Sequence, residues 1–140
     1  IDDDPEIELP DLIRRLQHQI EWKPESAARH LLKRKLRGHL PADATLANYE
    51  RLIQGILQST DASIYIYTVE STPYLTVAAT IENQIWLVIA NFSGIIETAF
   101  IVENPASYLK QPAFRYVGRL GEVLADDSYR IGKTVNTIRK

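Results

Sequence analysis

One eleven-residue segment of the chain combines the residue types that metal-free cleavage of RNA requires. Residues 29–39 read RHLLKRKLRGH and hold five Lys or Arg, two His and no acidic residue. Histidine accepts or donates a proton near neutral pH, and Lys and Arg stabilise the negative charge of a reacting phosphate. The segment therefore offers a base for the ribose 2′-hydroxyl, an acid for the 5′-oxygen and cations for the phosphate.

From this segment we take His30 and His39 as the candidate base and acid, and Lys33, Arg34 and Arg37 as candidate phosphate ligands. The alternative is a solvated basic helix face on which the histidines occur by chance. Runs of charge are usually solvated, so the segment taken alone favours that alternative.

Thr98 is a further candidate, on the second strand of a predicted hairpin. Strand alternation places it on one face with Ile96, Phe100 and Val102. On a face that lines a groove, its hydroxyl can bind a phosphate oxygen or a catalytic histidine. The simpler alternative is a threonine selected for β-propensity, with its hydroxyl satisfied locally. Glu97 falls on the opposite face and is expected to point to solvent.

Aromatic residues surround Arg115 near the end of the predicted sheet. Tyr108, Phe114 and Tyr116 are positioned in the sequence to stack an RNA base beside a phosphate held by Arg115. We therefore include Arg115 and Tyr116 among the candidate substrate-binding residues. The alternative is core packing, which is the commoner role of aromatic residues.

Several other classes of site are disfavoured. The chain has no cysteine, which excludes disulfides, zinc–thiolate sites and cysteine nucleophiles. His18, His30 and His39 lack the i, i+4 spacing of helical metal ligands, and P-loop, GxGxxG and HExxH motifs are missing. No apolar run approaches the roughly 20 residues that span a bilayer. We expect no cofactor and no membrane partner, and the sequence does not indicate a cellular location.

The elements that must position these residues follow from hydrophobic periodicity, which predicts an α+β fold. Helices are expected near residues 10–20, 26–37 and 45–58, and strands near 63–69, 74–81, 85–90 and 95–102, with a possible further strand at 114–117 and a strand or turn at 120–124. This order predicts N-terminal helices packed on one face of a roughly four-stranded antiparallel sheet.

The basic segment falls on the second of these helices. Ser26 is its predicted N-cap and Gly38 its predicted C-terminal stop. Ala28, Leu32 and Leu36 recur at intervals of four residues and predict the buried face, and Leu31 widens this apolar stripe. The cations and His30 form the other rows of the helix.

The 140-residue chain is long enough for one domain, which we place at residues 10–125. Residues 1–9 are predicted to be a solvated acidic leader, and residues 126–140 a loosely held polar tail. The sequence contains no methionine, not even at position 1, which indicates a domain cut from a longer protein or a processed fragment.

The chain resembles the BECR group of nucleases, which comprises barnase-, EndoU-, colicin- and RelE-like RNases, and in particular its phage-associated and polymorphic-toxin branches. The resemblance spans roughly residues 26–120 and lies in the segments RHLLKRKLRGHL, LANYERLIQGIL and IWLVIANFSGIIETAFIVENPASYL. It rests on the order of elements and on a strand pair whose second strand reads ETAF at residues 97–100.

The resemblance implies an RNase site built from His30 or His39, a neighbouring Arg or Lys, and Thr98. It also implies a toxin module of a longer protein, with a cognate inhibitor whose acidic side chains cover the basic groove. Many members carry a second polar cluster late in the chain, for which Arg115 and Tyr116 are the candidates here.

The favoured hypothesis is thus a metal-independent endoribonuclease toxin that cleaves RNA or tRNA by attack of the 2′-hydroxyl, leaving a 2′,3′-cyclic phosphate. The alternative is a non-enzymatic interaction domain whose basic helix binds an acidic protein partner. An RNase requires residues 30–39 and Thr98 to line one concave site. A binding module has no such requirement.

Overall fold

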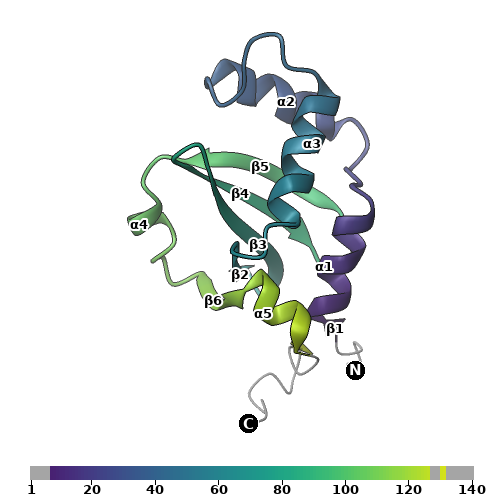
Figure 1. Cartoon of the computed structure of the whole chain (residues 1–140), viewed down its shortest axis with the longest axis vertical. Coiled ribbons are helices and arrows are strands. Elements are labelled where there is room, and N and C mark those ends of the chain that lie inside the picture. The colour runs from purple at the N-terminus through teal and green to yellow at the C-terminus, as the bar shows by residue number, and fades with distance from the viewer. Residues whose placement is uncertain (1–6, 127–129, 132–140) are drawn as a thin grey trace.

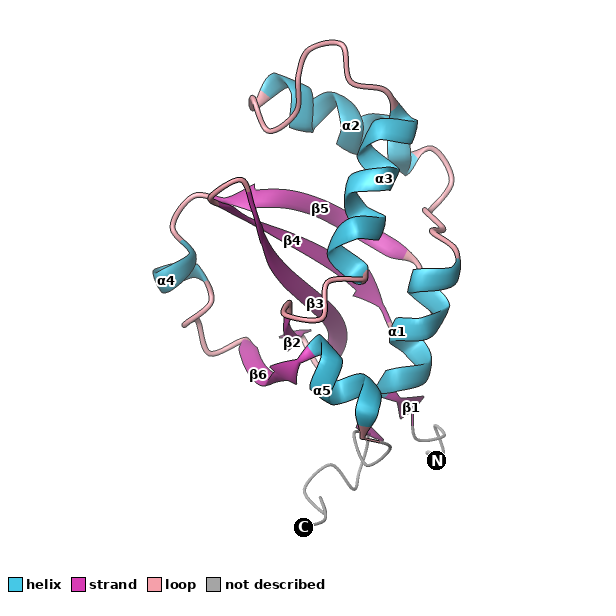
Figure 2. Ribbon diagram, viewed as in Figure 1, coloured by secondary structure: helices cyan, strands magenta, loops and turns pink. Residues whose placement is uncertain are grey.

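The computed structural model describes residues 7–126 and 130–131 and has the α+β architecture expected from the sequence (Figures 1 and 2). The helices are α1 (Leu9–His18), α2 (Ser26–Leu36), α3 (Leu46–Leu57), α4 (Pro105–Tyr108) and α5 (Leu120–Ala125). The strands are β1 (Ile7–Glu8), β2 (Ser63–Val69), β3 (Thr72–Ile81), β4 (Gln84–Asn91), β5 (Ile96–Val102), β6 (Phe114–Arg119) and β7 (Arg130–Ile131).

The main sheet has five strands in the order β5-β4-β3-β2-β6, and every neighbouring pair is antiparallel. Successive hairpins join β2 to β5, and Gly94 adopts the left-handed φ of +88° in the last of them. The chain then crosses to the far side of the sheet, where β6 pairs with β2. The sheet therefore has one strand more than the roughly four expected from the sequence. The additional strand is β6, which pairs with β2, a strand distant from it in the sequence.

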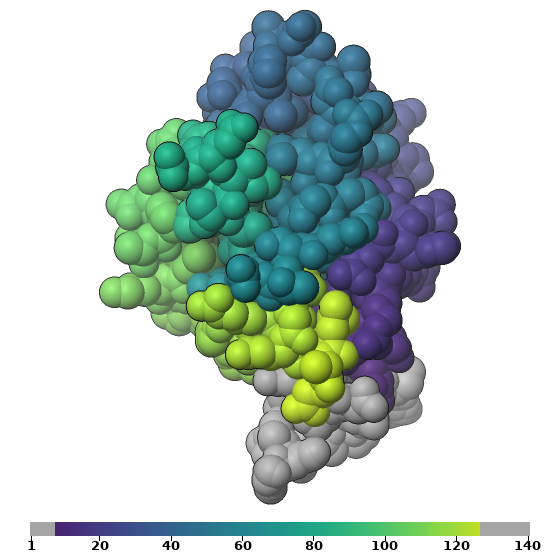
Figure 3. Space-filling view, in the orientation of Figure 1, coloured from purple at the N-terminus to yellow at the C-terminus, as the bar shows by residue number. Residues whose placement is uncertain are grey.

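The helices α1, α3 and α5 cover one face of the sheet and meet in one surface layer (Figures 2 and 3). Tyr49, Ile53, Ile56 and Leu57 of α3 are fully buried, and their helical spacing places them on one face. Alternate residues of the central strands complete this core, as the period of two requires.

The prediction of a strand or turn at residues 120–124 is wrong, because this segment forms α5. Leu120 and Val123 lie one helical turn apart, and both are fully buried in the core. Glu122 accepts a hydrogen bond from the backbone N–H of Arg119 (3.1 Å) and so caps the start of the helix.

The predicted buried face of α2 is also wrong. Ala28 is exposed, and Leu32 and Leu36 are 56% and 78% exposed, whereas Arg34 on another row is only 4% exposed. The helix lies beyond the edge strand β5, at the top of Figure 1. An edge strand presents unpaired backbone groups as well as side chains, and the inward side of α2 carries the polar Arg34 as well as Leu31, which packs against the core.

At the termini, β1 pairs with β7, Ile7 opposite Ile131 and Glu8 opposite Arg130. Leu9 begins α1 and is buried, so residues 7–9 belong to the fold rather than to a solvated leader. The other parts of the predicted leader and tail lie outside the described residues, apart from Asp126. Of the helices described, none has the length and apolar content needed to cross a bilayer.

Candidate functional site

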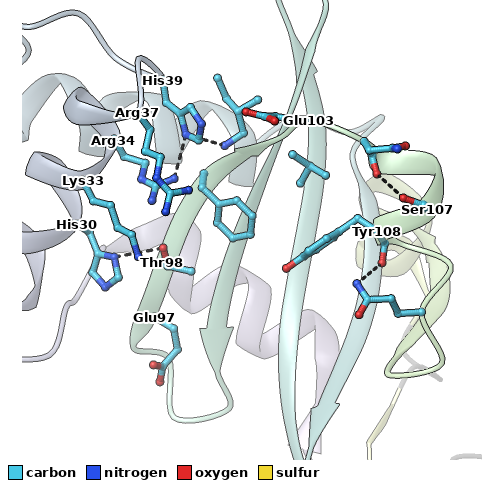
Figure 4. Close-up of a pocket in the computed structure, with 15 residues that line it drawn as sticks. His30, Lys33, Arg34, Arg37, His39, Glu97, Thr98, Glu103, Ser107 and Tyr108 are labelled. Atoms are coloured by element: carbon cyan, nitrogen blue, oxygen red, sulfur yellow. Dashed lines mark hydrogen bonds between the residues drawn. The ribbon is translucent and has the colours of Figure 1, made fainter.

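A groove of about 910 Å³ lies between α2, β5 and the segment that contains α4 (Figure 4). The first wall consists of the basic segment, namely His30, Lys33, Arg34, Arg37 and His39. The edge strand and the residue that follows it contribute residues 97, 98 and 100–103, and the opposite wall consists of Asn104, Ser107, Tyr108 and Gln111. The groove thus brings together Thr98 and all five candidate residues of the basic segment.

The backbone at both ends of α2 helps to orient the side chains of this basic wall. The helix begins at Ser26, but its N-cap is Glu25 in the left-handed region (φ +66°), so the predicted Ser26 cap is wrong and Ser26 is buried instead. At the other end, the predicted stop at Gly38 is confirmed by its φ of +76°. The N–H groups of Gly38 and His39 return to the carbonyls of Lys35 (3.1 Å) and Arg34 (2.8 Å). This turn directs His39 back toward β5.

The hydrogen bonds of His39 determine its tautomer. Its Nδ1 atom accepts from Arg34 (2.9 Å) and from the backbone N–H of Ile101 (3.2 Å). Neither partner can accept a hydrogen bond at these atoms, so Nδ1 carries no proton and the neutral ring carries its proton on Nε2. Burial lowers the pKa of His39, and Arg34 and Arg37 lower it further, against a smaller opposing effect of Glu103.

His30 is held by different contacts. Its Nδ1 atom lies 3.3 Å from Oγ1 of Thr98. Its ring stacks on Trp22, with centroids 5.9 Å apart and planes inclined by 25°, and Trp22 itself donates to Glu50 (2.9 Å). Burial lowers the pKa of His30, and the nearby cations of α2 lower it further. His30 is therefore an oriented, neutral imidazole at pH 7 and can act as a base.

Among the residues that the structure describes, no acidic side chain neutralises the charge of Arg34. Its side chain is 4% exposed, its Nε atom has no hydrogen-bond partner, and no carboxylate of the described residues forms an ion pair with it. Burial lowers its pKa, yet a guanidinium stays protonated. Arg34 bonds to His39 and lies over the Phe100 ring (5.7 Å). A buried cation that lacks a carboxylate partner is costly, and its place on the groove makes Arg34 a candidate binding site for an anion.

A β-bulge places Glu97 on the groove. Ile89 of β4 pairs with Thr98 and the next residue, Ala90, pairs with Ile96, so Glu97 has no partner in the ladder. Ile96 consequently lies in the core, while Glu97 lines the groove and pairs with Lys23 (3.4 Å). The core position of Ile96 and the groove position of Glu97 both contradict the predicted strand faces. The prediction assumed that side chains alternate strictly between the two faces, and a bulge interrupts that alternation.

Arg115 and Tyr116 are not brought to this groove. They lie on β6, at the opposite edge of the sheet from β5. Tyr116 is 54% exposed and its ring packs against Tyr65 at 5.4 Å. The structure instead supplies a wall that the sequence did not indicate, which lies within residues 104–111 and contains α4. Only Tyr108 of this wall was singled out from the sequence, because of its aromatic ring.

No group of three or more His, Asp or Glu side chains within the described part of the chain is arranged to hold a metal ion. Comparisons with protein-family models, with curated proteins and with solved structures find no match for this chain. The resemblance to BECR nucleases therefore stays a prediction, and the functional case rests on the groove itself.

The lowered pKa values of His30 and His39 predict that acid destabilises the fold. Below the ordinary histidine pKa of about 6.5 the unfolded chain binds more protons than the folded one. The free energy of unfolding should fall as the pH drops below that value, and the fall should be smaller in His39→Gln. Urea unfolding at about pH 7.5 and about pH 5.5 measures this. The exposed His18→Gln serves as the control, and an unchanged pH dependence in His39→Gln would contradict the assignment.

Proposed function

We propose that this domain is a metal-independent endoribonuclease. The observation that carries the proposal is the convergence on one groove of the Arg34 guanidinium, which has no ion pair among the described residues, and the oriented His30–Thr98 pair. A phosphodiester held by the cation lies beside a base in such a site. Positioning of this kind, together with stabilisation of developing charge, supplies much of the catalytic effect in comparable reactions.

In the proposed reaction His30 accepts the proton of the ribose 2′-hydroxyl. This role requires the tautomer in which Nδ1–H of His30 donates to Oγ1 of Thr98, which leaves the lone pair of Nε2 available as the base. The 2′-oxygen attacks phosphorus to form the 2′,3′-cyclic phosphate, and the bond from phosphorus to the 5′-oxygen breaks. Arg34 and Arg37 stabilise the phosphate charge but cannot release a proton, so the ammonium of Lys33 protonates the 5′-oxygen.

His39 has a supporting role in this proposal rather than that of the acid. Its Nδ1 lone pair is already used by two donors, and the neutral ring gives up its Nε2 proton only at extreme cost. The ring orients Arg34 through their 2.9 Å contact. From Nε2–H it can donate a hydrogen bond but not transfer a proton.

The proposal includes a toxin role with a cognate acidic inhibitor. The helix α2 contains no acidic residue, and its exposed side presents Leu32 and Leu36 among cations. A partner with carboxylates around an apolar surface would cover this side and obstruct the groove. The same exposed leucines favour the second candidate function, an interaction domain that binds an acidic protein through α2 without catalysis.

Incubation with total RNA or tRNA in the presence of EDTA separates these two functions. If the domain is a nuclease, the RNA should be cleaved and the new 3′ ends should carry a 2′,3′-cyclic phosphate. A matched comparison of His30→Ala with His39→Ala then tests the assigned roles, since the first should lose more activity. RNA that stays intact with the wild-type protein would favour the interaction domain.

A further inference from the structure

The wall of the groove that faces the cations has an aromatic surface. The rings of Phe100 and Tyr108 meet edge to face, with centroids 6.1 Å apart and planes at 82°. Figure 4 shows Tyr108 reaching from α4 toward β5. Its ring also packs against Phe114 (5.4 Å), and both Tyr108 and Phe100 remain partly exposed. These contacts hold the Tyr108 ring in place at the edge of the groove.

Neutral polar side chains accompany these rings. Asn104, Ser107 and Gln111 line the same wall. The amide of Gln111 donates to the carbonyl of Tyr108 (2.8 Å), which fixes its position beside the ring. Amide groups both donate and accept hydrogen bonds, so they match the edges of nucleobases.

The two walls therefore differ in chemistry. The α2 wall is cationic and suits a phosphate, whereas the α4 wall combines an aromatic ring with amides and suits a planar, hydrogen-bonding group. A volume of about 910 Å³ exceeds the needs of an isolated phosphate and lies within the usual range of small-molecule sites. A nucleotide unit has both parts in covalent connection.

We propose that the α4 wall is a nucleobase subsite, in which one base of the RNA stacks on Tyr108 while Arg34 holds an adjacent phosphate. This inference rests on the proposed function and narrows its substrate to single-stranded RNA. A base in a duplex is paired and stacked on its neighbours, so it cannot reach Tyr108. An unpaired base can be turned out and stacked on an aromatic side chain.

Binding of a fluorescent single-stranded oligodeoxynucleotide in EDTA tests the subsite apart from catalysis, because this probe lacks the 2′-hydroxyl. Tyr108→Ala should raise the Kd by roughly 5- to 150-fold, as expected for one stacked base. Tyr108→Phe keeps the ring plane and should bind within about twofold of the wild type. Tyr116→Ala removes an exposed tyrosine outside the groove and should leave the Kd unchanged.

Tyr108→Leu keeps an apolar side chain but has no aromatic plane, so it removes stacking while retaining apolar packing. Thermal melting identifies any variant that is unfolded. Weak binding by a folded Tyr108→Leu supports the subsite, and wild-type affinity in that variant overturns it. Equal affinity for the probe as a duplex also overturns it. Failure to cleave RNA, with the Tyr108 effect on binding intact, would remove only the catalytic proposal.

Discussion

Cleavage of RNA in EDTA by His30→Ala should be about 10²–10⁴-fold slower than by the wild-type protein, the usual contribution of a general base. His30 is the histidine whose Nε2 is left available by the contact of Nδ1 with Thr98. Its stacking on Trp22 keeps the ring in one orientation. Single-turnover rates measure the effect directly, and His18→Ala removes an exposed histidine as the matched control.

The pH dependence of the same reaction gives a second readout for His30. A base is active when unprotonated, and burial with nearby cations lowers the pKa of His30. The value of kcat/KM should therefore rise with pH, with the midpoint of the rise below the ordinary histidine pKa of about 6.5. The rising limb should be absent in His30→Ala. Wild-type rates in that variant would exclude His30 from the mechanism.

Replacing Arg34 with methionine is expected to separate activity from stability. The buried guanidinium has an unpartnered Nε atom and no ion pair within the described structure, and removal of such a charge in favour of an apolar group of similar size is often neutral or stabilising. His39 keeps one of its donors, the backbone N–H of Ile101. Arg34→Met should therefore have a Tm no lower than the wild type.

Cleavage by Arg34→Met should nevertheless fall by about 10²–10³-fold, because a preorganised donor to the reacting phosphate is lost. Thermal melting and single-turnover cleavage of the same protein samples provide the two measurements. Arg51→Met, at an exposed arginine of α3, is the control for loss of one positive charge. Unchanged cleavage, or a fall in activity that merely follows unfolding, would remove Arg34 from the site.

Burial explains which elements were predictable from the sequence. The spacing of Tyr49, Ile53 and Ile56 on α3 and the period-two strands reflect one face packed in the core. Such patterns involve residues that are close together in the sequence, and they therefore predict helices and strands well. The pairing of β6 with β2 depends on chain segments about fifty residues apart, for which local periodicity carries no signal.

The errors concentrate at the edge strand that bears the site. The backbone N–H groups of Ile96 and Ile101 are bound by Glu21 and His39, and the carbonyl of Ala99 accepts from the buried hydroxyl of Tyr49. Burial raises the pKa of Tyr49 to about 12, so that hydroxyl keeps its proton. The free backbone N–H and C=O groups of an edge strand require polar partners. For this reason an apolar stripe in the sequence could not identify the inward face of α2.

Residue types predicted one wall of the site but not the other. The basic segment and Thr98 stood out because their chemistry is unusual for a helix and an apolar strand face. Glu97 reaches the groove through a bulge, and the α4 wall belongs to an irregular connection without periodicity. Both depend on backbone geometry rather than on composition.

The central claim is that the groove between α2 and β5 holds a phosphodiester beside His30. Its most direct test is a single-stranded DNA oligonucleotide with one internal ribonucleotide, incubated with the protein in EDTA. The proposed mechanism predicts cleavage only on the 3′ side of that ribonucleotide, leaving a 2′,3′-cyclic phosphate, and a product yield greatly reduced with Arg34→Met. An oligonucleotide left intact by the wild-type protein, or one cut at deoxyribonucleotides, would contradict it.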